Sequence, residues 1–196
     1  MKNFLILFFA LSFIFLTSCS STSPLIKASY KGDTFAIQKL LNEGASINEA
    51  DDNGCTPLMH AIWSGKTEAA KTLISKGADV NAKDKSGYTP LLWAVSYENL
   101  DVAKLLIDKG ADINAKSNDE STPYALAVAS NNHELENLLK QKGAKANAKN
   151  KLLNDALFSA VQNKQPEIVK SLIAKGADIE TKDSFGMTPL VYAAYY

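Results

Sequence analysis

Residues 51–83 read DDNGCTPLMHAIWSGKTEAAKTLISKGADVNAK, and residues 84–116 read DKSGYTPLLWAVSYENLDVAKLLIDKGADINAK. The second stretch repeats the first in outline after 33 residues, and three features keep that spacing along the chain. They are the glycines Gly44, Gly77, Gly110, Gly143 and Gly176, the Thr-Pro starts at Thr56, Thr89, Thr122 and Thr188, and the alanines Ala28, Ala61, Ala94, Ala127, Ala160 and Ala193. Three series in one phase indicate a stack of repeats, because one such unit cannot bury its own apolar face.

Each unit carries the start and stop signals of two helices. Thr before Pro opens a helix, since the Thr hydroxyl caps a free N–H and Pro at the first helical position loses no hydrogen bond. The Gly of each Gly-Ala pair ends the second helix as a left-handed residue. In the unit quoted first, we predict helices at Pro57–Ser64 and Thr67–Lys76, followed by a projecting hairpin rich in turn residues.

This pattern resembles the ankyrin-repeat family over essentially all of residues 24–196, through the motifs Gly-x-Thr-Pro-Leu and Gly-Ala-Asp-(Val/Ile)-Asn-Ala. The resemblance implies an all-α fold, an ankyrin-repeat solenoid of stacked helix-turn-helix units with projecting hairpin loops. We expect units at residues 24–50, 51–83, 84–116, 117–149, 150–182 and 183–196. The last unit lacks its second helix, so we interpret the sequence as a fragment that continues with more repeats or another domain after Tyr196.

Two units depart from the pattern. Glu120 and Leu153 replace the hairpin Gly, so those turns must avoid positive φ or bear strain. The fifth unit has Asp155 where Thr is expected. Because Asp also caps helices, we still expect the first helix of that unit to begin there.

The first residues read as an export signal. A short positive start is followed by an apolar run from Phe4 to Leu16, shorter than the roughly 20 residues of a spanning helix. Leu16-Thr17-Ser18-Cys19 resembles the bacterial lipobox, which implies a signal peptide at residues 1–18, a lipid on Cys19 and a short tether at residues 19–23. For a bacterium with two membranes, the same resemblance implies the outer membrane, because Ser20 rather than Asp follows the lipidated position. The alternatives are a retained anchor helix and an ordinary secretory peptide in which the Cys occurs by chance.

Composition argues against several classes of function. The 21 basic residues are all Lys and balance 21 acidic ones, so neither net charge nor Arg favours nucleic acid. The two histidines, His60 and His133, belong to no metal-binding spacing, and no phosphate-cradling Gly loop is present. Cys55 has no base beside it in sequence, and His60 is expected to pack or to contact its hairpin. We therefore expect no enzyme, no cofactor, no metal and no small-molecule substrate.

The resemblance places a partner-binding surface on the hairpin tips and the exposed side of each first helix, which form a concave face. The residues expected to bind a protein partner are Asp52, Asn53, Trp63, Lys85, Tyr88, Tyr97, Asn118, Asp119 and Phe185. The aromatic members carry most weight, because aromatic side chains dominate binding hot spots. Trp93 and Tyr192 lie one helical step away and are expected to pack between repeats.

The leading interpretation is a monomeric, lipid-anchored scaffold of the bacterial cell envelope that faces the periplasm or the exterior. Its partner would be a protein whose identity the sequence does not name. Two alternatives remain open. One is a secreted effector that binds host proteins, and the other is the N-terminal regulatory part of a longer enzyme.

Overall fold

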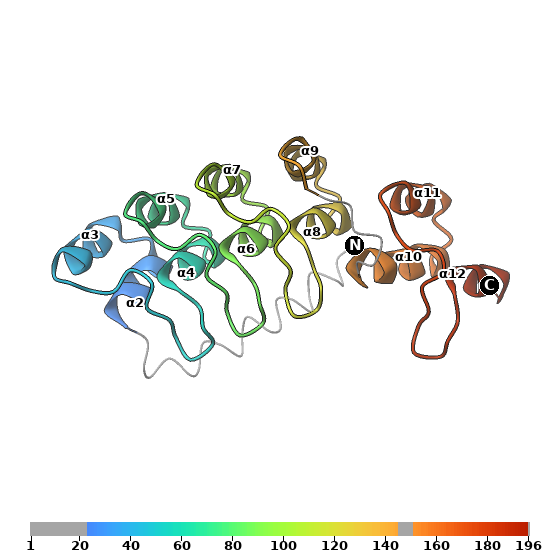
Figure 1. Ribbon diagram of the computed structural model, residues 1–196, viewed down its shortest axis with the longest axis horizontal. Helices are drawn as coiled ribbons and strands as arrows, with labels where there is room; N and C mark the ends of the chain where they lie inside the picture. Colours follow the sequence, from blue (N-terminus) through green and yellow to red (C-terminus); the bar gives the residue numbers. More distant parts are fainter. Residues whose placement is uncertain (1–22, 145–150, 196) are drawn as a thin grey trace.

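The computed structural model describes residues 23–144 and 151–195, which form eleven helices and no strand (Figure 1). The helices are α2 (Pro24–Lys31), α3 (Thr34–Asn42), α4 (Pro57–Trp63), α5 (Thr67–Ser75), α6 (Pro90–Ser96), α7 (Leu100–Asp108), α8 (Pro123–Ala129), α9 (His133–Gln141), α10 (Lys151–Gln162), α11 (Pro166–Ala174) and α12 (Pro189–Tyr195). Even-numbered helices form an inner row and odd-numbered helices an outer row, with hairpins projecting from the inner side (Figure 1). The expected all-helical stack is confirmed.

The inner helices begin as the sequence predicts. The hydroxyl of Thr56 accepts the N–H of Met59, and the hydroxyl of Thr89 accepts the N–H of Leu92, each with Pro at the next position. Ser23 caps α2 in the same way. In the unit of residues 51–83, both helices end one residue earlier than predicted, at Trp63 and Ser75.

The outer helices end alike in all five units that have one. Each Gly of the Gly-Ala series adopts a left-handed φ between 87° and 93°. The N–H of the following Ala then donates to a carbonyl five residues earlier, for example Ala78 to Leu73 at 3.0 Å and Ala111 to Leu106 at 2.9 Å. This confirms the role predicted for the series, since one local geometry closes every outer helix.

The core lies between the rows and between neighbouring units. Inner helices pack in sequence, α2 on α4, α4 on α6, α6 on α8, α8 on α10 and α10 on α12. Ala61, Ala94 and Ala127 have no exposed surface, which explains why this position stays small along the stack. Leu58 and Leu91, at another repeated position, are equally buried. Burial therefore comes from stacking rather than from any unit alone.

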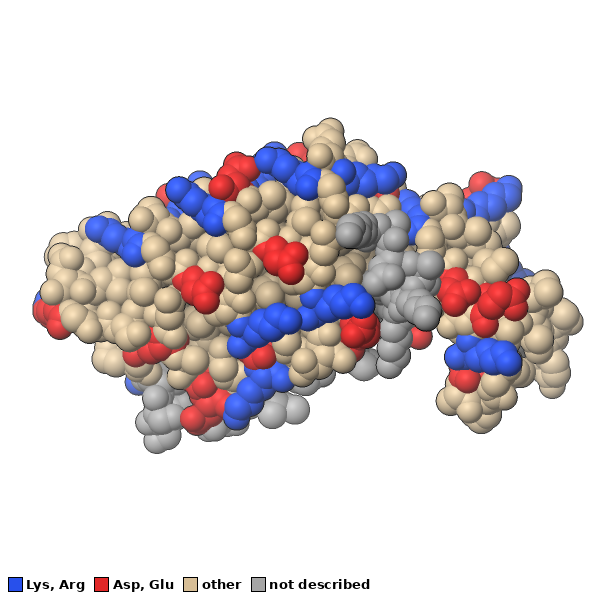
Figure 2. Space-filling model, in the orientation of Figure 1, with Lys and Arg blue, Asp and Glu red and all other residues tan. Residues whose placement is uncertain are grey.

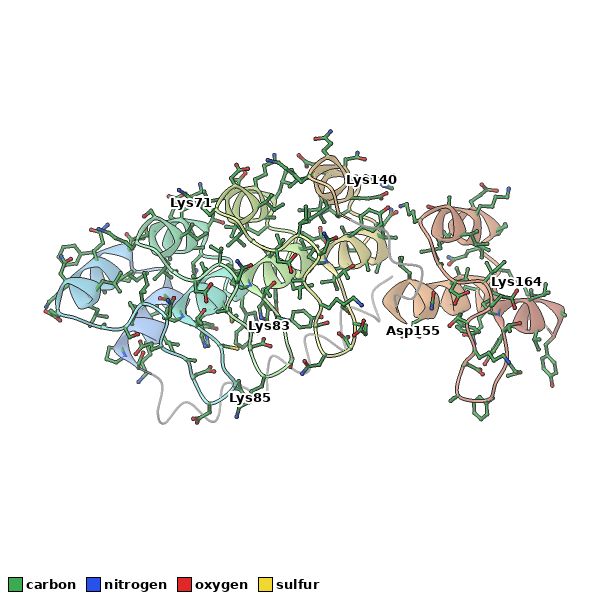
Figure 3. The ribbon with its side chains drawn as sticks, viewed as in Figure 1. Lys71, Lys83, Lys85, Lys140, Asp155 and Lys164 are labelled. Atoms are coloured by element: carbon green, nitrogen blue, oxygen red, sulfur yellow. The ribbon has the colours of Figure 1, made fainter. Side chains whose placement is uncertain are left out.

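In the fifth unit, the expected helix start at Asp155 is wrong, and the structure shows how Leu153 replaces the hairpin Gly. Helix α10 begins at Lys151, so Asp155 lies inside the helix, exposed, and does not cap it (Figure 3). The helix forms because residues 151–162 contain neither Gly nor Pro, and Leu153, Leu157 and Ala160 share one buried face. Leu153 thus avoids positive φ within a helix, whereas Glu120 accepts a left-handed φ of 65°.

The last inner helix differs from the others in exposure. Leu190 occupies the position of Leu58, Leu91 and Leu157, which are at most 1% exposed, yet Leu190 is 77% exposed. Val191 beside it is 46% exposed. Among the described residues, no helix covers this face of α12.

The predicted signal peptide and Cys19 lie outside the described residues. Within residues 23–144 and 151–195, no helix has both the length and the apolar character needed to cross a bilayer.

Hairpin glycines allow neighbouring hairpins to approach. A Cβ on Gly87 would lie 2.9 Å from the backbone nitrogen of Asn118, and Gly87 has a φ of +76°. Gly110 has a similar φ of +87° but open space around it. We expect Gly87→Ala to lower the free energy of unfolding by about 2 kcal/mol or more and Gly110→Ala by about 1 kcal/mol. Urea unfolding followed by circular dichroism measures both, and equal losses would contradict tight hairpin stacking.

Candidate functional site

The carboxylate of Asp51, at the start of the first described hairpin, stabilises the hairpin and connects it to the inner helix α4. Oδ1 of Asp51 accepts the N–H groups of Asn53 and Cys55 at 2.8 and 2.9 Å. Oδ2 of Asp51 lies 2.8 Å from Nε2 of His60 on α4. The expectation that His60 contacts its hairpin is therefore confirmed, and the imidazole serves to hold the hairpin against the helix.

The same contact between a hairpin aspartate and the following inner helix recurs in two other units, with other side chains as its partner. Oδ2 of Asp84 accepts a hydrogen bond from Nε1 of Trp93 at 2.9 Å, and Oδ2 of Asp183 accepts one from the hydroxyl of Tyr192 at 2.7 Å. In each case the partner lies nine residues after the aspartate. Trp93 and Tyr192 are thus hairpin anchors, and Trp93 also lies against a ring of the neighbouring unit.

Five aromatic side chains from three consecutive units form a continuous cluster, which we call the aromatic patch. Its members are Tyr30, Trp63, Tyr88, Trp93 and Tyr97. Trp93 is central: its ring centroid lies 6.4 Å from Trp63, 5.0 Å from Tyr88 and 5.9 Å from Tyr97. Tyr30 meets Trp63 edge-on at 6.4 Å. Such contacts hold the rings in place before any partner arrives.

The aromatic patch is partly open to solvent. Tyr30 is 42% exposed and Tyr97 is 39% exposed, and the other three rings are partly buried. Burial raises the pKa of Tyr97, although a hydrogen bond with Trp63 opposes the shift. Both ends of the patch therefore present accessible ring surface, while its centre is fixed by packing.

Burial and three nearby carboxylates raise the pKa values of two side chains on the hairpins, Tyr88 and Cys55. Burial raises the pKa of Tyr88 to about 12, and the charges of Asp119 and Asp84 add to the shift. Burial also raises the pKa of Cys55 to about 12, with Asp51 and Asp84 adding to it. The thiol of Cys55 stays protonated at neutral pH, so it lacks the thiolate that a nucleophile needs.

Some of the predicted hairpin residues connect neighbouring hairpins by hydrogen bonds, and others lie within one hairpin or at its exposed tip. The N–H of Lys85 donates to the carbonyl of Asn53 at 2.9 Å, and the side-chain amide of Asn118 donates to the carbonyl of Lys85 at 2.9 Å. Asn118 therefore joins one hairpin to the next. Asp119 accepts hydrogen bonds from the hydroxyl of Ser117 and the N–H of Ser121 within its own hairpin, while Asp52 is an exposed tip residue.

The structure brings some predicted residues together and separates others. Trp63, Tyr88 and Tyr97 meet in the aromatic patch, whereas Phe185, 81% exposed, belongs to the last hairpin beyond α10. Sequence reasoning left out Tyr30 and assigned Trp93 to packing. Tyr30 lies 33 residues before Trp63, and this spacing could have identified it from the sequence.

Metal ligands and surface hollows are two further features of the part of the chain that the structure describes. No group of three or more His, Cys, Asp or Glu side chains there is arranged to hold a metal ion. A hollow of about 360 Å³ on α3 is lined by Phe35, Gln38, Lys39, Asn42 and Glu43. All five side chains come from this one outer helix and its C-cap, and none of them belongs to the aromatic patch.

Comparison with known proteins identifies a related family. A family model for ankyrin repeats, built on three copies, matches residues 4–84, 25–117, 80–150 and 124–196. A search of curated proteins finds no match to the sequence.

Proposed function

Because the chain belongs to the ankyrin-repeat family, we propose that it is a lipid-anchored scaffold of the bacterial cell envelope that binds a protein partner through its concave face. Ankyrin repeats typically act as interaction modules without catalysis. The partner would lie against the aromatic patch and the hairpins beside it. The chain would act as a monomer and require no cofactor, nucleic acid or small-molecule substrate.

The aromatic patch is the observation that carries the binding part of this proposal. Buried hot spots of protein interfaces are enriched in Trp and Tyr, which supply a large contact area with few rotatable bonds. Here five such rings lie side by side on three units, and two of them are more than a third exposed. Their mutual contacts reduce the entropy that binding must overcome.

We expect the double substitution Trp63→Ala with Tyr97→Ala to weaken the partner complex by more than about 2 kcal/mol, roughly 30-fold in Kd. The partner is first captured from detergent-solubilised membranes with the full chain, then purified and titrated by calorimetry. Circular dichroism checks that the variant stays folded. Phe35→Ala serves as the control, since Phe35 is 79% exposed on α3, outside the patch. Partner affinity unchanged by the double substitution would refute this surface.

The membrane part of the proposal depends on Leu16-Thr17-Ser18-Cys19. Two or three acyl chains on Cys19 would anchor the protein stably, because each buried CH₂ contributes about 0.8 kcal/mol. We expect mass spectrometry of the membrane fraction to find a diacylated Cys19 at the mature N-terminus, with the outer membrane as its location. Cys19→Ala should abolish the lipid and leave the precursor uncleaved. Recovery of a soluble, unlipidated mature chain would favour the secreted effector instead.

A further inference from the structure

The hairpins and the outer helices differ in charge. The three hairpins beside the aromatic patch, residues 45–55, 78–88 and 111–121, carry more carboxylates than lysines. The carboxylates are Glu49, Asp51, Asp52, Asp79, Asp84, Asp112, Asp119 and Glu120, and the lysines are Lys83, Lys85 and Lys116. The hairpins are therefore acidic, although the whole chain has a net charge of zero.

The outer edge of the stack does not share this excess. Helices α3, α5, α7 and α9 with their C-cap residues carry Lys39, Lys71, Lys76, Lys104, Lys109, Lys140 and Lys142 against Glu43, Glu68, Asp101, Asp108, Glu134 and Glu136. Figure 2 shows lysines along this edge, and Figure 3 places Lys71 and Lys140 there, opposite Lys85 on a hairpin. Helix α2 adds Lys27 and Lys31 to the side that holds the aromatic patch. The hairpin carboxylates still outnumber the lysines there, so negative charge is concentrated on this side.

Carboxylates also lie directly beside the rings. Asp84 bonds to Nε1 of Trp93 at 2.9 Å. Asp51 bonds to His60 at 2.8 Å, and the ring of His60 lies 5.8 Å from that of Trp63. The electron-rich faces of Trp and Tyr attract cations within about 6 Å, and nearby carboxylates strengthen that attraction. An acidic segment would instead be repelled, and a neutral one would gain nothing from the charge.

We propose that the partner presents a basic segment to the aromatic patch, so that its Lys or Arg side chains lie against Trp63 and Tyr97 and face the hairpin carboxylates. This inference rests on the proposed protein-binding function and names the chemistry of the partner. The charges steer the segment to the patch and the rings hold the stems of its long side chains.

Tryptophan fluorescence tests the proposal directly, because the chain has only two tryptophans, Trp63 and Trp93, and both lie in the patch. The probes are three peptides of equal length, which alternate Arg with Ser, Gln with Ser, or Glu with Ser. A neutral chitin oligosaccharide is the fourth probe and tests whether the rings bind a sugar instead of a basic peptide. They are titrated into the full chain in a non-ionic detergent. We expect the Arg peptide to bind at least about tenfold more tightly than the Gln peptide and to weaken with added salt. The Glu peptide should leave the fluorescence unchanged.

Paired variants separate the hairpin charges from charge in general. Asp52→Asn with Glu120→Gln removes two exposed hairpin carboxylates and should weaken the Arg peptide about fivefold or more. Glu68→Gln with Glu134→Gln removes two exposed carboxylates from the outer helices and should change its affinity less than about twofold.

Three results would overturn the inference: equal binding of the Arg and Gln peptides, a response to the oligosaccharide alone, or equal effects of the two paired variants. Failure here is distinct from failure of the proposed function. If the captured partner loses affinity for the Trp63→Ala, Tyr97→Ala chain while the Arg peptide does not bind, the protein-binding surface stands and its basic ligand does not.

Discussion

Leu91→Ala is expected to lower the free energy of unfolding by about 3 kcal/mol. Leu91 has no exposed surface and lies where α6 meets its neighbours in the stack. Truncating a buried Leu to Ala removes apolar contacts and leaves a cavity, which together cost about 2–5 kcal/mol. Urea unfolding of the full chain in detergent, followed by circular dichroism, measures the loss.

Leu190→Ala is the matched control, because Leu190 occupies the same repeat position and is 77% exposed. We expect it to change stability by less than about 0.5 kcal/mol. The contrast isolates stacking between units, since the local sequence around both residues is Thr-Pro-Leu. Similar losses at Leu91 and Leu190 would contradict the conclusion that burial by neighbouring units stabilises the stack.

Lys175→Met is expected to destabilise the protein by about 3 kcal/mol at neutral pH. Nζ of Lys175, at the C-cap of α11, lies 2.7 Å from Oε2 of Glu136 on α9, and the Glu136 side chain is only 7% exposed. Removing the cation leaves a buried carboxylate whose polar contacts are with His133 and Tyr124 and on which the charge of Lys140 still acts. Loss of one member of a buried ion pair typically costs about 3–5 kcal/mol.

The effect of this substitution should depend on pH. Burial pushes the pKa of Glu136 upward, but the hydrogen bond and charge of Lys175, together with a hydrogen bond from His133 and the charge of Lys140, lower the pKa overall. The pair therefore stabilises the fold fully above the pKa of Glu in the unfolded chain, and this contribution is lost as pH falls through the lowered value. Without Lys175, the largest of the contributions that oppose burial is lost, so Glu136 takes up a proton more readily. The cost of Lys175→Met should consequently shrink as the solution is made acidic.

Lys142→Met provides the control for the pH titration. Lys142 also bonds to a carboxylate of another unit, Asp108 at 2.8 Å, but both side chains are about half exposed. We expect a loss below about 1 kcal/mol with little dependence on pH. Denaturant unfolding of both variants from neutral to acidic pH gives the comparison, and a pH-independent loss for Lys175→Met would contradict a charged Glu136 at the joint between α9 and α11.

The fold could be predicted from sequence because its signals are local and repeated. Thr56 and Thr89 cap helices through their own side chains, and Gly77 and Gly110 end helices through their own φ. Such features depend on few neighbours, and the 33-residue period multiplies each of them. In the units that keep these signals, tertiary packing decided which leucines are fully buried.

The fifth unit could not be predicted in detail because two local signals compete there. Asp155 is a good cap, yet the residues before it are good helix formers and Leu153 finds a buried place on the same face as Leu157. Burial of Leu153 extends the helix past the possible cap. A second series with a 33-residue spacing was missed. It begins with Gly32 and Gly65, whose φ values are 80° and 68°, and continues with Glu98, Asn131 and Lys164, whose φ values lie from 53° to 56°. The change of residue type concealed a conserved backbone geometry.

The candidate site was predicted in part for a similar reason. Trp63, Tyr88 and Tyr97 are recognisable by type and register, but Trp93 joins them only because Asp84 holds its indole beside the hairpin. That contact requires the fold of the hairpin itself. Phe185 has the right type and register, yet it is displaced from the other rings by the intervening units.

Fluorine NMR of the full chain labelled with fluorotryptophan tests the binding surface most directly. Trp63 and Trp93 give one resonance each, assigned by single Trp→Phe substitutions. On addition of the purified partner, we predict that both resonances shift, because both indole rings belong to the aromatic patch and neither is fully buried. Formation of the complex with both resonances unmoved would contradict binding at the aromatic patch.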